Sequence, residues 1–205
     1  MRILPAESGA EEGEKVTVME RVDHLQSLSG RRLNIGSGQH PLRYWTNLDE
    51  SQDALADVRY HVPPLRYADE SLDEIYAGHF LEHLTPAEAD EFVRECSRCL
   101  THGGKLGIVV PDTREVVQRY LRGDIDEIEF PRGVWRPINN LNTLCDLFFY
   151  STVQESPHRW SYDTDTLGTL LVRHGFELVK PINRFSDPRI PVGAWYQCGW
   201  DAVKR

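Results

Sequence analysis

Three ionisable side chains, His79, Glu82 and His83, stand close together in the segment HFLEHL. If the segment is helical, the spacing i, i+3 and i+4 places all three on one face. Imidazole and carboxylate groups exchange protons or bind metal ions near neutral pH, so the segment is a candidate for acid–base chemistry or a metal site. The letters H-x-x-E-H also match the order in inverted zinc peptidases, where both histidines bind zinc and the glutamate activates water.

The residues before this segment argue against a zinc site. A zinc peptidase needs a long helix that begins before the first histidine, whereas residues 72–77 (LDEIYA) read as a strand that runs straight into the motif. A zinc hydrolase using His79, Glu82 and His83 is therefore a minor alternative, as is a solvated turn with no chemical role. No resident metal is expected.

A second candidate site lies at Gly36-Ser37-Gly38, which closes the short apolar run 32–35. Glycine tolerates a positive φ and lets a ligand approach the backbone closely. The dinucleotide fingerprint requires a third glycine and an acid about 20 residues further on. Here Pro41 replaces that glycine and Asp49 comes sooner, so a pyrophosphate site is disfavoured and an acid that binds a ribose remains. The alternative is a tight turn beside a solvated acid.

Alternating strands and helices must position these residues. Seven segments are predicted as strands: 32–35, 46–48, 57–62, 72–77, 105–110, 176–180 and 195–203. Helices are predicted at 14–28, 86–100, 112–121 and 164–174, with Gly103-Gly104 ending the second of them, and residues 41–45 form a short segment of helical character. This rhythm predicts an α/β fold: a doubly wound, mostly parallel (Rossmann-like) sheet of about seven strands with helices on both faces.

The pattern breaks in two places. Residues 1–30 form an N-terminal extension with an amphipathic helix, and residues 31–205 form a single domain. Within that domain, residues 123–162 are rich in Trp, Asn and Pro and contain one helical stretch near residues 141–150. We interpret 123–162 as an inserted lid above the carboxyl ends of the strands, where α/β proteins bind their ligands.

Composition excludes several classes of protein. The net charge of −9 disfavours a nucleic-acid partner, which would need a basic face. No apolar run is long enough to span a membrane, and the acidic N-terminus does not resemble a secretory signal, so we expect a cytoplasmic protein. Residues 114–205 carry 12 basic and 12 acidic side chains, against 11 and 20 in residues 1–113, which favours an anionic ligand in the second half. Cys96 and Cys99 are predicted to lie in a helix core.

Several segments in the right order resemble one family, the class I S-adenosylmethionine-dependent methyltransferases, and within it the small bacterial type 11. LNIGSGQHP resembles its first strand and turn, and TNLDES its second strand. PPLRYADESLDEIYAGHFLEHL and VRECSRCLTHGGKLGIVVPD resemble its later motifs. The similarity runs from residue 31 to residue 112, with weaker support from HRWSYDTDTLGTLLVRHGFELV.

The resemblance implies S-adenosyl-L-methionine as cofactor and a set of contacts to it. The glycine turn would face the methionine half, Asp49 would bind the ribose hydroxyls, and the turn after the fourth strand would lie beside the sulfonium. His61 stands where the family usually has an aspartate that bonds adenine, so its ring or the Val62 backbone would have to serve. The implied cofactor residues are Asn34, Gly36, Ser37, Gly38, Asp49, His61, Val62, Gly78 and His79.

The resemblance also implies O-methylation of a small hydroxyl acceptor, such as a sugar of a surface polysaccharide or its nucleotide-linked precursor, in polysaccharide biosynthesis. A hydroxyl acceptor needs a base, and Glu82 and His83 are the first candidates, followed by His79 and His158. Lid residues that could hold an anionic sugar are Arg132, Trp135, Arg136, Arg159, Trp160 and Tyr162. Methylation of another small molecule, a non-catalytic S-adenosylmethionine-binding module and a partner subunit remain alternatives, and the sequence allows a homodimer.

Overall fold

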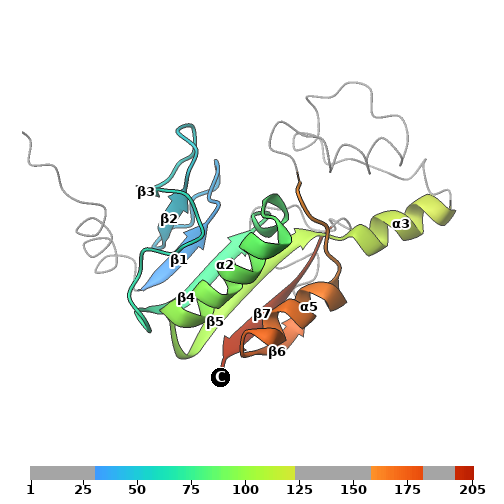
Figure 1. The fold of residues 1–205 in the computed structure, drawn as a ribbon. Coiled ribbons are helices and arrows are strands. Elements are labelled where there is room, and N and C mark those ends of the chain that lie inside the picture. The colour runs from blue at the N-terminus through green and yellow to red at the C-terminus, as the bar shows by residue number, and fades with distance from the viewer. Residues whose placement is uncertain (1–30, 123–157, 182–196) are drawn as a thin grey trace, which may run out of the picture.

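The computed structural model describes residues 31–122, 158–181 and 197–205, and its centre is a seven-stranded sheet in the order β3-β2-β1-β4-β5-β7-β6 (Figure 1). Neighbours from β3 to β5 run parallel, whereas β7 is antiparallel to both β5 and β6. The strands are β1 (Arg32–Ile35), β2 (Thr46–Asp49), β3 (Val58–Arg59), β4 (Leu72–Gly78), β5 (Leu100–Pro111), β6 (Phe176–Pro181) and β7 (Gln197–Lys204). The predicted mostly parallel sheet is confirmed.

The edge strand β3 is shorter than the predicted 57–62. Asp57 lies just before β3 and uses its side chain on the neighbouring strand, where its Oδ2 accepts hydrogen bonds from the backbone N of Asn47 (2.8 Å) and from Asn47 Nδ2 (3.0 Å). After Arg59 the chain turns away, and the hydroxyl of Tyr60 accepts a bond from the backbone N of Arg66. Asp57 thus joins β2 through its side chain as well as through its backbone N, which donates to the Asn47 carbonyl (2.8 Å).

Helix α2 (Pro86–Cys99) begins as predicted but ends earlier than Gly103-Gly104. Thr85 and Glu88 form a reciprocal capping box at its start. The chain passes directly from Cys99 into β5 at Leu100, so the two glycines lie inside a strand. Gly103 has φ +77°, and a Cβ on Gly104 would meet the Thr101 carbonyl oxygen at 2.8 Å. The glycines therefore permit an irregular strand instead of ending the helix.

The connection from β1 to β2 is made of turns, so the expectation of helical character at 41–45 is wrong. The Asn47 side chain holds this connection in place of a helix. Its Oδ1 accepts from the backbone N of Leu42 (2.7 Å), and its Nδ2 donates to the carbonyls of Leu42 and Trp45. One buried amide thereby satisfies the backbone groups that a helical turn would have paired internally.

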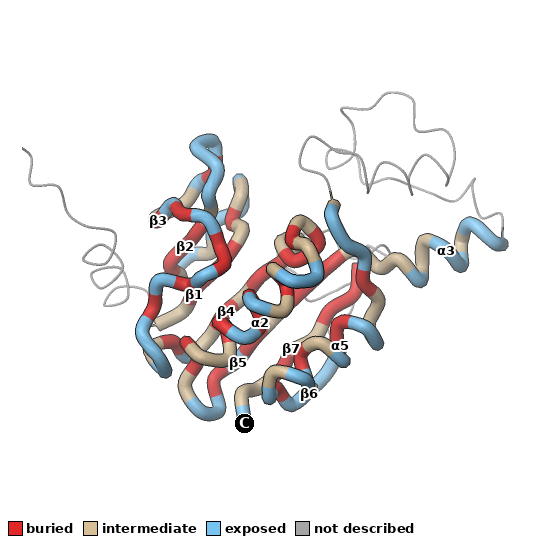
Figure 2. The backbone as a smooth tube through the Cα atoms, viewed as in Figure 1, coloured by how far each residue is buried: buried red, intermediate tan, exposed pale blue. Residues whose placement is uncertain are grey.

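Two further helices, α3 (Thr113–Arg122) and α5 (Thr164–Arg173), lie close to their predicted positions. Figure 1 shows α2 and α5 over the same face of the sheet and α3 projecting beyond the end of β5. Figure 2 shows the buried residues gathered where the strands meet α2 and α5. None of the described helices is long and apolar enough to cross a membrane. The predicted helices at 14–28 and 141–150 lie outside the described residues.

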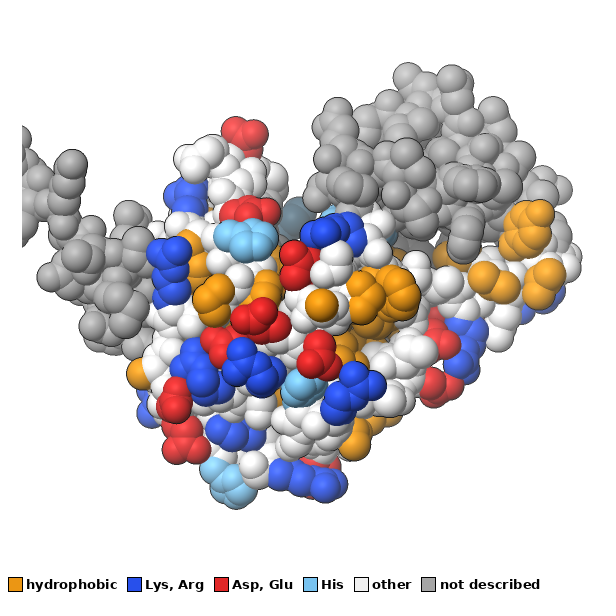
Figure 3. All heavy atoms as spheres, viewed as in Figure 1, with side chains coloured by type: hydrophobic (Ala, Val, Ile, Leu, Met, Phe, Trp, Pro, Cys, Tyr) orange, Lys and Arg blue, Asp and Glu red, His pale blue; other side chains and the backbone are white. Residues whose placement is uncertain are grey.

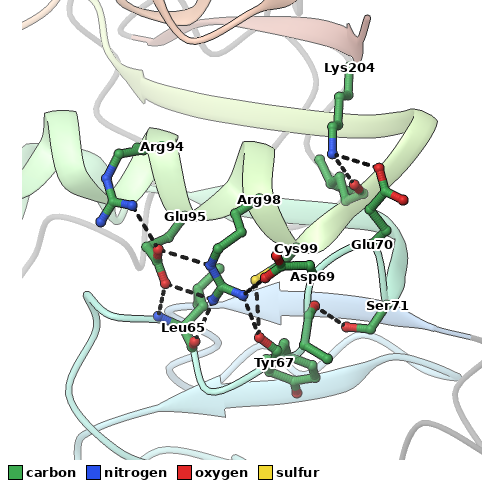
Figure 4. A network of polar contacts seen from close by, with 12 residues as sticks. Leu65, Tyr67, Asp69, Glu70, Ser71, Arg94, Glu95, Arg98, Cys99 and Lys204 are labelled. Atoms are coloured by element: carbon green, nitrogen blue, oxygen red, sulfur yellow. Dashed lines mark hydrogen bonds and ion pairs between the residues drawn. The ribbon is translucent and has the colours of Figure 1, made fainter.

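Arg98 on α2 fastens the loop before β4 to that helix (Figure 4). Its guanidinium donates to the carbonyls of Leu65 (3.0 Å) and Tyr67 (2.9 Å) and to the carboxylate of Glu95 (2.8 Å). Glu95 in turn accepts from the backbone N of Leu65. Cys96 and Cys99 are buried beside this network, as predicted for core residues, and burial raises the pKa of the Cys99 thiol to about 11.

The face that carries α2 and α5 has mixed charge. Figure 3 shows acidic and basic side chains interspersed over it. Arg173 pairs with Asp90 (3.2 Å) and Arg159 with Glu88 (2.9 Å), so both guanidinium groups are balanced by carboxylates.

Candidate functional site

The glycine turn leaves β1 and bends across the end of β2. The backbone N–H groups of Gly36 (2.9 Å) and Ser37 (3.2 Å) both donate to the carbonyl of Leu48. Gly36 has φ +68° and Gly38 has φ +49°, both in the left-handed region that favours glycine. A Cβ on Gly36 would meet the Phe80 ring at 3.0 Å, whereas a Cβ on Gly38 would meet nothing within 4 Å. Gly36 is therefore fixed by packing, and Gly38 borders open space.

Asp49, the last residue of β2, joins this turn through both carboxylate oxygens. Its Oδ2 accepts from the backbone N of Gly38 (2.8 Å), and its Oδ1 accepts from the backbone N of Ser51 (2.9 Å). The structure thus brings the glycine turn and the predicted ribose-binding acid together. Each carboxylate oxygen keeps one lone pair, which a ribose hydroxyl can use.

Two buried polar atoms beside the turn lack a protein partner among the described residues: Asn34 Oδ1 and Ser37 Oγ. The amide of Asn34 is fixed because its Nδ2 donates to Asn47 Oδ1 (2.9 Å). Buried polar groups are normally hydrogen-bonded, so unpaired atoms at a turn that opens on space are suited to a polar ligand. These atoms, the glycine turn and Asp49 fit the methionine and ribose parts of S-adenosylmethionine.

His61, the predicted adenine contact, lies on the surface and already has a partner. Its Nδ1 lies 2.7 Å from Glu50 Oε2, while the neighbouring Val62 is buried. Glu50 follows Asp49, so the imidazole is tied to the same end of β2. The assignment of adenine to His61 and Val62 stays a prediction.

The turn after β4 holds His79 in a strained conformation. Its φ is +51°, which is uncommon for a residue with a Cβ. The imidazole is fixed from two sides, with Nδ1 at 3.2 Å from Glu82 Oε1 and Nε2 at 3.2 Å from Gln197 Oε1. A carboxylate oxygen and an amide oxygen both accept, so each contact is a hydrogen bond when the ring nitrogen that faces it carries a proton. Strain held by several contacts is typical of functional sites.

Glu82 lies in η1 (Leu81–His83), a single 3-10 turn, so the predicted shared helical face does not form. The turn still brings His79 and Glu82 together, whereas His83 lies against His158. The rings of His83 and His158 pack edge to face with centroids 4.9 Å apart. The arrangement differs from the H-x-x-E-H zinc template, because His158 rather than His79 stands with Glu82 and His83.

The electrostatics of this group favour an ionised glutamate. The Glu82 side chain is 1% exposed, and burial raises its pKa. The hydrogen bond from His79 and the histidines nearby lower the pKa more, so it lies below the ordinary glutamate value. Burial lowers the pKa of His158 to about 4, and it raises the pKa of Tyr162 to about 12. A buried carboxylate is thus surrounded by groups that can bind or move a proton.

The residues that were predicted to bind the acceptor lie in different places. Arg132, Trp135 and Arg136 lie outside the described residues. Arg159 directs its guanidinium to Glu88 on α2, and Trp160 is 51% exposed. Tyr162 is buried, and it forms a β-bridge with Asp112 after β5.

Sequence reasoning missed Gln197, the first residue of β7. It is 118 positions from His79 and reaches it because β7 pairs antiparallel with β5, next to β4. Its Nε2 is buried and has no partner among the described residues. No local pattern marks this residue, so only the sheet topology reveals it.

Comparisons with known proteins concern the fold and the family. Residues 39–108 match the type 11 family model that is described as a methyltransferase domain. A SAM dependent methyltransferase from Archaeoglobus fulgidus is 16% identical and has a TM-score of 0.54, with 91% of this chain and 93% of that chain covered. An S-adenosylmethionine dependent methyltransferase from Mesorhizobium loti is 15% identical with a TM-score of 0.54, over 94% and 100% of the two chains.

A search of curated proteins found no match. The solved structures show the shared fold, and the family match over residues 39–108 supports methyltransferase activity. The match over residues 39–108 and the shared fold support a class I S-adenosylmethionine-dependent methyltransferase that is similar to the type 11 family.

Proposed function

We propose that this enzyme transfers the methyl group to a hydroxyl of a small acceptor, most simply a sugar of a surface polysaccharide or its nucleotide-linked precursor. The observation that carries the proposal is the buried Glu82, which stands with His79, His83 and His158 beside the end of β4. A sugar hydroxyl must lose its proton during transfer, so its methylation needs a group that accepts a proton at the site.

Each group of site residues would have its own role in the transfer. The glycine turn and Asp49 would hold S-adenosylmethionine, which supplies an electrophilic methyl on a sulfonium. Gly78 and the strained His79 would place the acceptor oxygen in line with the methyl–sulfur bond. The acceptor oxygen forms the new bond to carbon, the carbon–sulfur pair returns to sulfur, and Glu82 or His83 takes the hydroxyl proton. The products are the methyl ether and a neutral thioether.

The last residues of the predicted lid support the acceptor side of the proposal. The backbone N–H groups of Arg159 (2.7 Å) and Trp160 (3.2 Å) both donate to the carbonyl of Glu82. The half-exposed indole of Trp160 is therefore anchored next to the proposed base. Aromatic rings in such positions stack on the apolar faces of sugars and ring compounds.

An acceptor screen tests this proposal. The enzyme is incubated with methyl-labelled cofactor and a panel of nucleotide sugars, free sugars, amines and thiols, and the product that gains label is identified by mass spectrometry. We expect label on a hydroxyl of an anionic or nucleotide-linked sugar. Label found only on nitrogen or sulfur would reject O-methylation.

A further inference from the structure

Glu82, His83 and His158 bring two imidazoles and one carboxylate to a single point near the end of β4. Each side chain offers one ligand atom, and these atoms lie within 4.8 Å of one another. The group combines η1 with a residue 75 positions further along the chain, so it is a product of tertiary structure. Two histidines and a carboxylate form a recurrent ligand set for divalent transition metals.

One carboxylate oxygen of Glu82 has a hydrogen-bond partner, and the other has none among the described residues. Glu82 Oε1 lies 3.2 Å from His79 Nδ1, whereas Oε2 is buried with no hydrogen-bond partner among the described residues. An ionised oxygen buried without a partner is unfavourable, and a cation is the strongest partner that it could acquire. In metal sites, a ligating carboxylate is itself commonly held by an outer hydrogen bond, which here is the bond from His79.

The backbone keeps His158 at this place. The next two residues, Arg159 and Trp160, donate their N–H groups to the Glu82 carbonyl, and the Arg159 guanidinium binds Glu88 on α2. These contacts tie the chain on the carboxyl side of His158 to η1 and α2. The imidazole of His158 is thereby held against that of His83.

We propose that Glu82, His83 and His158 bind one divalent transition-metal ion, of which Zn²⁺ is the best match to this ligand set. Three protein ligands leave an open coordination position, as in catalytic zinc sites. What the ion does there rests on the proposed function: the open position takes the acceptor hydroxyl and lowers its pKa. The hydroxyl proton passes to bulk water, the oxygen then bonds to the methyl carbon, and the carbon–sulfur electron pair returns to sulfur, so no oxidation or reduction is involved.

Calorimetry tests the binding step without any methyl acceptor. Tag-free full-length protein is stripped with a chelator, dialysed and titrated with ZnCl₂, and a parallel titration uses MgCl₂. We expect one Zn²⁺ per chain and no comparable Mg²⁺ binding. The variants His83→Gln and His158→Gln should each bind Zn²⁺ at least about tenfold more weakly, because each removes a ligand.

The matched control is His102→Gln, which removes an exposed histidine from β5 and should leave Zn²⁺ affinity unchanged. Zn²⁺ binding that is absent from the wild type, or equal in wild type and His158→Gln, would overturn the metal site. S-adenosylhomocysteine binding, measured for every variant, reports whether the protein is folded.

The two proposals can fail separately. If Zn²⁺ binds as expected but no hydroxyl acceptor is methylated, the metal site stands and the proposed O-methylation fails. If a hydroxyl is methylated at full rate by chelator-stripped protein that binds no Zn²⁺, the metal inference fails and the proposed function stands, with Glu82 or His83 as the base.

Discussion

At the scale of single residues, Glu82 is the feature that most distinguishes this site. A carboxylate that is 1% exposed is costly unless neighbours favour its charged form. His79, strained at φ +51° and fixed by Gln197, donates to it from one side, and His83 and His158 stand on the other. The strain and the burial are both explained if the chemistry takes place there.

Replacing Glu82 by Gln should abolish most turnover and leave cofactor binding in place. The amide keeps the shape of the side chain but cannot accept a proton or bind a metal as a carboxylate does. We expect kcat to fall by roughly 10²- to 10⁴-fold, the usual contribution of a general base. S-adenosylhomocysteine affinity should stay near that of the wild type. The control variant Glu91→Gln, at an exposed residue of α2, should change neither kcat nor this affinity. A loss of affinity with unchanged kcat would contradict the assigned role.

Asp49→Asn should weaken cofactor binding. The amide can no longer accept hydrogen bonds at both of its terminal atoms, so either the Gly38 turn or the ribose loses a partner. Bonds to a charged group contribute about 1.5–3 kcal/mol, so we expect roughly a 10- to 100-fold higher Kd for S-adenosylhomocysteine by calorimetry. The control is Asp53→Asn, which changes an exposed acid in the segment between β2 and β3. Equal affinities in the two variants would argue against Asp49 as the ribose ligand.

At the scale of elements, α2 supports the site through its two ends. Its capping box fixes the start of the helix just after η1, and Arg159 binds the capping residue Glu88. Near its other end, Arg98 holds the loop that leads into β4 (Figure 4). Helix α2 is therefore bonded to the loop that precedes β4 and to the segment that contacts η1.

The Arg98–Glu95 pair should make stability depend on pH. Hydrogen bonds from Arg98 lower the pKa of Glu95 more than burial raises it. A carboxylate whose folded pKa is depressed stabilises the fold fully above its unfolded pKa, about 4.3, and loses that contribution as the pH falls through the folded pKa. Urea unfolding of the wild type at pH 7 and at lower pH should therefore show a larger loss of stability than Arg98→Met shows over the same range.

Arg98→Met should also cost about 2 kcal/mol at pH 7, since it removes the closest cation from Glu95 and leaves the carbonyls of Leu65 and Tyr67 without this donor. Arg173→Met removes an exposed ion pair with Asp90 and should cost less than about 1 kcal/mol. Similar losses in the two variants would show that the Arg98 network does not fasten the loop.

At the scale of the whole molecule, the sheet order decides which residues meet. The order β3-β2-β1-β4-β5-β7-β6 places the ends of β1, β2 and β4 side by side, so the glycine turn, Asp49 and His79 come together. The reversed strand β7 then starts where the parallel strands end, and its first residue, Gln197, reaches the same edge.

A ligand that uses this edge should stabilise the whole domain. At a hundredfold excess over its Kd, S-adenosylhomocysteine should add about 2.7 kcal/mol to the free energy of unfolding and raise Tm accordingly. NAD should leave Tm unchanged, because Pro41 replaces the third glycine of a pyrophosphate site. Stabilisation by NAD alone in differential scanning fluorimetry would contradict this assignment of the site.

The sequence by itself determined the elements whose signals are local. Three elements were predicted close to their observed positions: the run 32–35 with its glycine turn, the strand that contains Ile108–Val110, and the Thr85 cap of α2. Turn chemistry, capping and strand hydrophobicity act over a few residues, so a local pattern is enough to predict them. Asp49 could be assigned to the same edge because strand ends follow from the α/β rhythm. The glycines at 103–104 misled the prediction, since glycine also serves irregular strands.

Only the tertiary structure decided the composition of the cluster around Glu82. His158 and Gln197 lie 75 or more positions from the residues that they contact, and no periodicity links such distant segments. The sheet topology, with β7 reversed beside β5, and the backbone bonds of residues 159 and 160 to Glu82 bring them there. A local motif of three residues thereby became a site of five, in which the buried Glu82 and Gln197 lie with the partly buried His79, His83 and His158, because packing rather than spacing chose the partners.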